Sequence, residues 1–188
     1  VFIPTLRRTR LLTGSDSEDP LASGLEFSWD DWRSYWVKTD IEKFEYNLID
    51  EGFILAAPHT KHVYESLITR DDGCGIDYME VELRPTWTLE IIDKSGKYQY
   101  SKRHVWIDKE FYFTRHQSTW DPRGNLFKSY DDYRDWKPST GEGQWGALLT
   151  VNNVTRRTTS MTMQATWEDR GVNIDESMFD VDQLRDYQ

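Results

Sequence analysis

The chain has 188 residues, enough for one domain with a substantial buried core. Its 23 basic and 33 acidic side chains give a net charge of −10, which argues against non-specific binding to nucleic acid or to anionic membranes. A single cysteine, Cys74, excludes an internal disulfide and a cysteine-based zinc cluster.

The first residues predict a strand, a polar loop and one helix. The strand is expected over residues 1–12 and the loop over 13–24. Ser28 can cap a helix over residues 28–37, with Asp31 three positions further on. One face of that helix carries three tryptophans at positions i, i+3 and i+7: Trp29, Trp32 and Trp36. The helix is therefore expected either to close over a ligand as a lid or to pack on the sheet as plain core.

Strand signals dominate the middle of the chain. Residues 41–57 are predicted to form a pair of strands around Asp50-Glu51-Gly52. Alternation with a period of two is strongest over 79–91, where one parity is apolar and the other is charged or hydroxylated. Such alternation is typical of a strand with one buried face and one wet face.

The second half predicts a meander of antiparallel strands. A turn is expected at 93–97, and strands follow at 98–107, 111–120 and 125–134. At Asp121-Pro122-Arg123-Gly124 a turn is predicted, because Pro presets φ and Gly accepts a positive φ. Residues 135–147 are expected to be a loop. In the last hairpin four apolar residues alternate with polar ones: Met161, Met163, Ala165 and Trp167. A sheet of this length must twist and curl.

Several short segments occur in an order and spacing that resemble a known family. They are the strand with Pro4 and Arg7-Arg8, the helix start at 24–31, the segment 100–108, the turn at 121–128, and residues 161–163 with 175–179. Together they resemble the LolA-like outer-membrane lipoprotein-sorting proteins. The spacing in the middle is also similar to a related periplasmic family of unknown function, often encoded beside RND-type exporters.

The resemblance implies a mainly β fold, a curved antiparallel sheet or half-open β-barrel of LolA type with a short aromatic lid helix. It implies one domain over residues 1–188, lacking the family's N-terminal strands and export signal. The function implied is that of a carrier in the periplasm of a Gram-negative bacterium, without enzymatic activity, cofactor or metal. Its expected ligand is a lipid or an acylated lipoprotein, and its expected partner an RND-type exporter or an outer-membrane protein.

A hydrophobic cavity would hold the acyl chains, because each CH₂ moved out of water gains about 0.8 kcal/mol. The predicted walls are six apolar side chains: Trp87, Leu89, Ile91, Met161, Met163 and Trp167. Trp29 and Trp32 are predicted to cover them. Plain packing of the same residues in a closed core is the alternative.

Other chemistry has weaker support in the sequence. His59, His62 and Glu65 have the spacing of metal ligands on one helix face, but polar surface residues are the default interpretation. Carboxylates are so abundant that a catalytic pair can always be drawn. Two rival functions remain: a carbohydrate-active domain with exposed tryptophans, and a scaffold that docks a segment of a partner protein.

Overall fold

The computed structural model describes residues 2–3, 8–9, 18–21, 23–34, 41–59, 68–69, 76–77, 80–139 and 141–162. Seven of its strands form one antiparallel sheet in the order β11-β10-β9-β8-β7-β6-β3. Their bounds are β3 Phe44–Ala56, β6 Glu82–Asp93, β7 Lys102–Asp108, β8 Thr114–Trp120, β9 Leu126–Lys137, β10 Glu142–Asn152 and β11 Arg157–Thr162.

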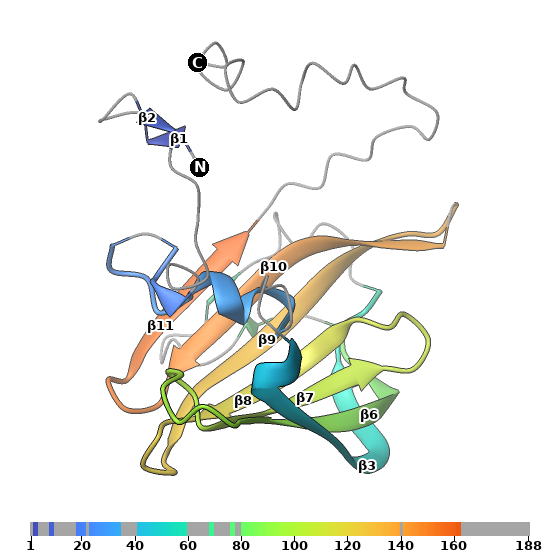
Figure 1. Cartoon of the computed structure of the whole chain (residues 1–188). Helices are drawn as coiled ribbons and strands as arrows, with labels where there is room; N and C mark the ends of the chain where they lie inside the picture. Colours follow the sequence, from blue (N-terminus) through green and yellow to red (C-terminus); the bar gives the residue numbers. More distant parts are fainter. Residues whose placement is uncertain are drawn as a thin grey trace.

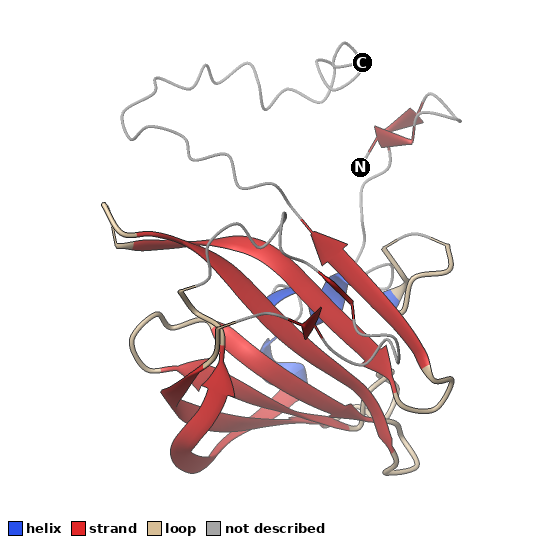
Figure 2. Ribbon diagram, turned by 180° about the vertical axis from the view of Figure 1, so that it is seen from behind, coloured by secondary structure: helices blue, strands red, loops and turns tan. Residues whose placement is uncertain are grey.

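Two small sheets and two short helices complete the described elements. β1 (Phe2–Ile3) pairs with β2 (Arg8–Thr9), and β4 (Ile68–Thr69) pairs with β5 (Ile76–Asp77). The helices are 3₁₀ helices, η3 (Trp29–Ser34) and η4 (Ile41–Lys43). Both lie on one face of the sheet, in front of it in Figure 1 and behind it in Figure 2. None of the helices in the described part of the chain has the length and apolar character needed to cross a membrane.

The predicted fold class is confirmed, since the described chain is an open, curved antiparallel sheet with few helices (Figures 1 and 2). The strands predicted at 79–91, 98–107, 111–120 and 125–134 correspond to β6, β7, β8 and β9.

Four local predictions are wrong. The expected strand pair within 41–57 is one long strand, β3, which follows helix η4, because a bulge between Leu48 and Asp50 replaces the expected turn. The expected loop at 135–147 is largely strand, since β9 runs to Lys137 and β10 begins at Glu142. The expected first strand is a pair of short strands, and the expected α-helix is the six-residue 3₁₀ helix η3.

Bulges line up across the sheet and change which side chains are buried. In β3 the bulge lies opposite Thr88 and Leu89 of β6, and in β8 a second bulge lies opposite Trp106 and Ile107 of β7. Thr88 pairs with Trp106, so the two irregularities are neighbours. Bulges bend a strand and increase its twist.

This bend inverts the expected burial of the first half of β6. Arg84, Thr86 and Thr88 are buried there, whereas Leu83 is 62% exposed. The prediction of a wet polar face is therefore wrong for this half of the strand. Beyond the bulges the next buried residue is Ile91, of the opposite parity.

An apolar core lies where the segment 18–34 meets the last strands. Phe27 stacks on Tyr130 of β9 with ring centroids 6.0 Å apart and an interplanar angle of 20°. Trp145 and Leu148 of β10 complete this cluster, and Leu21 and Met161 pack against it. The rest of the described interior is polar to an unusual degree.

Candidate functional site in the polar interior

Helix η3 is fixed to the sheet by its acidic side chains. The backbone N–H and the hydroxyl of Ser28 donate to Asp31 Oδ2 at 2.8 and 2.9 Å, so the predicted pairing of Ser28 with Asp31 forms with Asp31 as the acceptor. Asp30 and Asp31 are 0% and 1% exposed. We call Asp30, Asp31 and their partners on the sheet the helix anchor; those partners are Tyr98, Tyr100, Arg103 and Lys128.

Each aspartate of the helix anchor has a phenolic donor. Tyr100 Oη donates to Asp31 Oδ1 and Tyr98 Oη donates to Asp30 Oδ2, both at 2.6 Å. Burial, together with the nearby aspartates, raises the pKa of Tyr100 well above its usual value, so this phenol stays protonated and remains a donor.

Two cations complete the helix anchor. Arg103 Nη1 donates to the carbonyl oxygen of Asp30 at 3.1 Å, and Lys128 Nζ lies 3.4 Å from Asp31 Oδ2. The helix is therefore held to the sheet by buried hydrogen bonds between charged groups, whereas the sequence predicted contact through an aromatic face.

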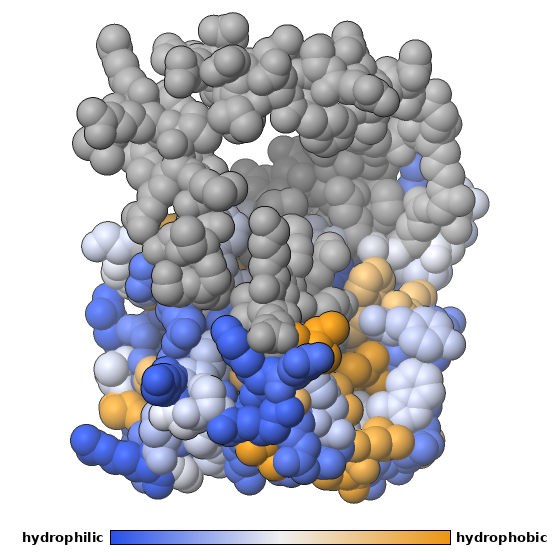
Figure 3. Space-filling view, in the orientation of Figure 1, coloured by the Kyte–Doolittle hydropathy of each residue, from blue (hydrophilic) through white to orange (hydrophobic). Residues whose placement is uncertain are grey.

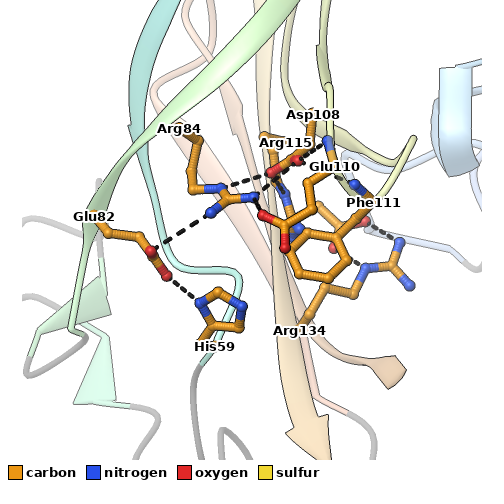
Figure 4. A network of polar contacts seen from close by, with 9 residues as sticks. His59, Glu82, Arg84, Asp108, Glu110, Phe111, Arg115 and Arg134 are labelled. Carbon is orange, nitrogen blue, oxygen red and sulfur yellow. Dashed lines mark hydrogen bonds and ion pairs between the residues drawn. The ribbon is translucent and has the colours of Figure 1, made fainter. Parts of the chain in front are cut away.

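A second set of buried charges lies at the end of β7 (Figure 4). Asp108 is fully buried, and its Oδ2 accepts from Arg84 Nε at 3.0 Å and from Arg115 Nε at 3.1 Å. Its Oδ1 accepts the backbone N–H groups of Glu110 and Phe111 at 2.9 and 3.1 Å. Burial alone would raise the pKa of Asp108, but these hydrogen bonds outweigh it and hold the pKa below its usual value.

Arg134 extends the set toward β9. It donates from Nη2 to Asp132 Oδ2 at 2.7 Å, and its Nε lies 2.6 Å from Asp132 Oδ1. Burial raises the pKa of Asp132 although Arg134 and Arg115 oppose the shift. We call Arg84, Arg115 and Arg134 the arginine cluster.

Aromatic rings cover the arginine cluster. The guanidinium carbons of Arg84 and Arg115 lie 5.2 and 5.3 Å from the centroid of Phe111. That of Arg134 lies 4.3 Å from the centroid of Phe113. These contacts are within the range of cation–π attraction.

The rim of the cluster is more exposed than its interior. Arg84 also pairs with the carboxylates of Glu110 and Glu82, whose side chains are 59% and 43% exposed. His59 pairs with Glu82 and lies edge-on to Phe111 and Trp136. His62 and Glu65 lie outside the described residues, and within the described part of the chain no group of three ligands is suited to a metal.

The predicted wall residues lie in two places. Ile91 is buried, while Trp87 and Leu89 are half-buried on β6. Met161 lies on β11 beside the apolar core, and four strands separate β11 from β6 in the order of the sheet. The structure therefore does not bring Met161 next to the β6 residues within the sheet.

The other predicted residues are less fully described. Trp29 is half-buried at the start of η3, and Trp32 belongs to the same helix, its side chain lying outside the described part. Met163 and Trp167 lie outside the described residues. A ligand-binding role for all these residues stays a prediction.

The arginine cluster was missed by sequence reasoning. Its members lie on β6, β8 and β9. In the sequence, each arginine occupies its strand in a pattern that is equally typical of a solvent-facing cation. The one available signal was the density of charge, at 30% of residues.

Comparison with known proteins places the chain in a family. Residues 1–185 match the model of a family described as protein of unknown function, DUF1329, and the chain belongs to this family. No curated protein matches the sequence. The predicted resemblance to LolA-like proteins is confirmed at the level of the fold.

Two solved structures have the same fold. One, from Vibrio parahaemolyticus, is provisionally called an outer-membrane lipoprotein-sorting protein domain; it is 18% identical, with a TM-score of 0.62, and the match covers 98% of this chain. The other is a DUF1329 family protein from Desulfovibrio piger ATCC 29098, 16% identical with a TM-score of 0.59 over 97% of this chain. The chain spans 64% and 62% of the lengths of these two proteins.

Proposed function

We propose that the protein is a non-enzymatic carrier of the Gram-negative periplasm that binds a lipid or the acyl chains of a lipoprotein. The observation that carries this proposal is the open curved sheet with a helix on one face, which matches the Vibrio domain over 98% of the chain. Burial of acyl chains needs no covalent step, because each CH₂ contributes about 0.8 kcal/mol. An RND-type exporter or an outer-membrane protein would supply or receive the ligand.

The chemistry of the polar interior supports binding over catalysis. A general base needs a pKa near the working pH. Asp108 is instead held ionised by two arginines, with its pKa below the usual value, and is a weak base. Such an arrangement is suited to fixing the shape of the sheet and to recognising charge.

Mass spectrometry of the full-length gene product, purified without detergent and extracted with solvent, tests the carrier function. We expect a stoichiometric lipid or acylated peptide, and recovery of binding when the extract is added back. Leu89→Gln should reduce the amount retained, because it puts an amide on a predicted wall. Leu126→Gln, at a 43% exposed position, is the matched control and should retain the ligand. A folded full-length protein that neither retains nor rebinds any lipid would contradict the proposal.

Docking of a partner protein is the second candidate, favoured by the edge of the sheet. Phe53, Leu55 and Leu83 are 65%, 69% and 62% exposed, and Leu55 pairs with Leu83. Figure 3 shows apolar residues on the side of the molecule where β3 lies. An exposed apolar edge strand is a template for strand addition. If docking is the function, Phe53→Lys should abolish co-purification with an exporter subunit, and no lipid should be retained.

A further inference from the structure

The arginine cluster places three guanidinium groups in the buried interior of the protein. The side chains of Arg84, Arg115 and Arg134 are 7%, 1% and 3% exposed. Among the described residues, the buried carboxylates that they contact are Asp108 and Asp132, at 0% and 1%. Arg84 is also paired at the rim with Glu110 and Glu82. A buried charge is costly unless it is paired, so an anion that enters the cluster has to take the place of one of these carboxylates.

Polar atoms on β6 and β8 also have no hydrogen-bond partner among the described residues. Arg115 Nη1 is a buried donor of this kind, in a residue that is 2% exposed. Three further buried oxygens have no hydrogen-bond partner among the described residues: Gln117 Oε1, Thr114 Oγ1 and Thr86 Oγ1. Thr86 pairs with Asp108 in the sheet, and the other three residues lie together on β8. Buried polar atoms without partners normally mark bound water or a bound ligand.

Glu110 already occupies the solvent side of Arg84. It lies in the turn between β7 and β8, and its side chain is 59% exposed although it pairs with a guanidinium that is almost fully buried. Tyr112 in the same turn has a φ of 56°, in the left-handed region, and is itself exposed. A short exposed turn gives up a carboxylate contact at lower cost than a packed strand does.

We propose that the arginine cluster binds the phosphate or carboxylate head of an anionic amphiphile, and that Glu110 is the internal carboxylate which this head displaces. The guanidinium fork matches both oxyanions through paired hydrogen bonds. Phe111 and Phe113, which cover the guanidinium groups, exclude water from the site and offer contact to the first carbons of the ligand. The inference rests on the proposed carrier function and names the class of its ligand.

Isothermal titration calorimetry of the full-length protein tests the inference with three probes: dioctanoyl phosphatidic acid, dioctanoylglycerol and inorganic phosphate. The first two share their acyl chains and differ in the head. We expect phosphatidic acid to bind about tenfold or more tightly than dioctanoylglycerol, because charge-assisted hydrogen bonds discriminate by at least that factor. Inorganic phosphate should bind weakly, since it buries no chains.

Arg115→Met should remove this preference while leaving the affinity for dioctanoylglycerol unchanged. The variant is expected to fold, because it leaves two buried arginines facing two buried aspartates. Glu110→Gln removes the competing charge at an exposed position and should raise the affinity for phosphatidic acid about threefold to tenfold. Arg123→Met, at an exposed turn, is the matched control and should change neither affinity.

The outcomes separate the inference from the function on which it rests. Equal affinity for the two lipids, unaltered by Arg115→Met and Glu110→Gln, would overturn the anion site and leave the carrier intact. Binding of inorganic phosphate alone, lost in Arg115→Met, would overturn the amphiphile and identify a free oxyanion as the ligand. If the folded protein binds none of the probes, both proposals fail.

Discussion

Asp31 of the helix anchor joins helix η3 to the sheet. It accepts from Ser28 and Tyr100 and lies beside Lys128. Asp31→Ala would leave a buried phenol and a buried ammonium without their acceptor. We expect a loss of about 3–5 kcal/mol in the free energy of unfolding, measured by urea denaturation. Asp19→Ala, at an exposed position, is the control and should change stability by less than about 0.5 kcal/mol.

Asp108 should make stability depend on pH. Its pKa is below the usual value in the folded protein, so the unfolded chain binds more protons and stability rises with pH in this range. The contribution is complete above about pH 4 and is lost as the pH falls through the folded-state pKa. Urea denaturation between pH 7 and pH 2.5 should therefore show a steeper loss for the wild type than for Asp108→Asn. Parallel curves would contradict the assignment.

At the scale of residues, the sequence predicted local chemistry and missed distant partners. The turn at 121–124 forms with Gly124 at a φ of 84°, as predicted from its residue types. The pairing of Ser28 with Asp31 was predicted from their spacing. The bond from Tyr100 to Asp31 spans 69 positions, and a spacing rule cannot reach that far.

At the scale of elements, alternation along β6 predicted a strand but misplaced its buried half. The set of alternate residues that is buried changes near Thr88. Bulges in β3 and β8 bend the sheet on either side of this point. These bulges belong to the pairing of neighbouring strands, so the sequence of β6 alone does not contain them.

Two leucines, one buried and one exposed, give a matched test of the burial seen in the structure. Leu148 of β10 is fully buried in the apolar core, and Leu55 of β3 is 69% exposed. We expect Leu148→Ala to lower the free energy of unfolding by about 2–5 kcal/mol. Leu55→Ala should lower it by less than about 0.5 kcal/mol. Similar losses in chemical denaturation would mean that β3 is covered in solution.

At the scale of the whole molecule, the order of short motifs was enough to predict family and fold, whereas the candidate site was not predictable. The motifs mark successive strands and turns, so their order along the chain reflects the order of the elements in the fold. The arginine cluster depends instead on three strands meeting after the sheet curls, and its charges are indistinguishable in sequence from those of a wet face. The predicted cavity walls, such as Leu89, follow from hydrophobicity, which does not indicate where a charged group would bind.

The net charge of −10 sets how the protein should approach a lipid. A negative molecule is repelled by an anionic membrane surface, but a single anionic lipid can still enter a buried cationic site. We therefore expect no co-flotation with phosphatidylglycerol vesicles at physiological salt. Cationic vesicles at low salt are the positive control and should carry the protein with them, an attraction that salt should weaken.

Strong co-flotation with anionic vesicles would mean that local basic surface overrides the net charge. In that case the protein would adsorb to the membrane before it takes up a ligand. Absence of co-flotation, combined with tight binding of monomeric phosphatidic acid, would instead require that a partner protein present the lipid. That combination is the one expected here, because the arginine cluster is buried and paired with carboxylates and so cannot attract a surface from a distance.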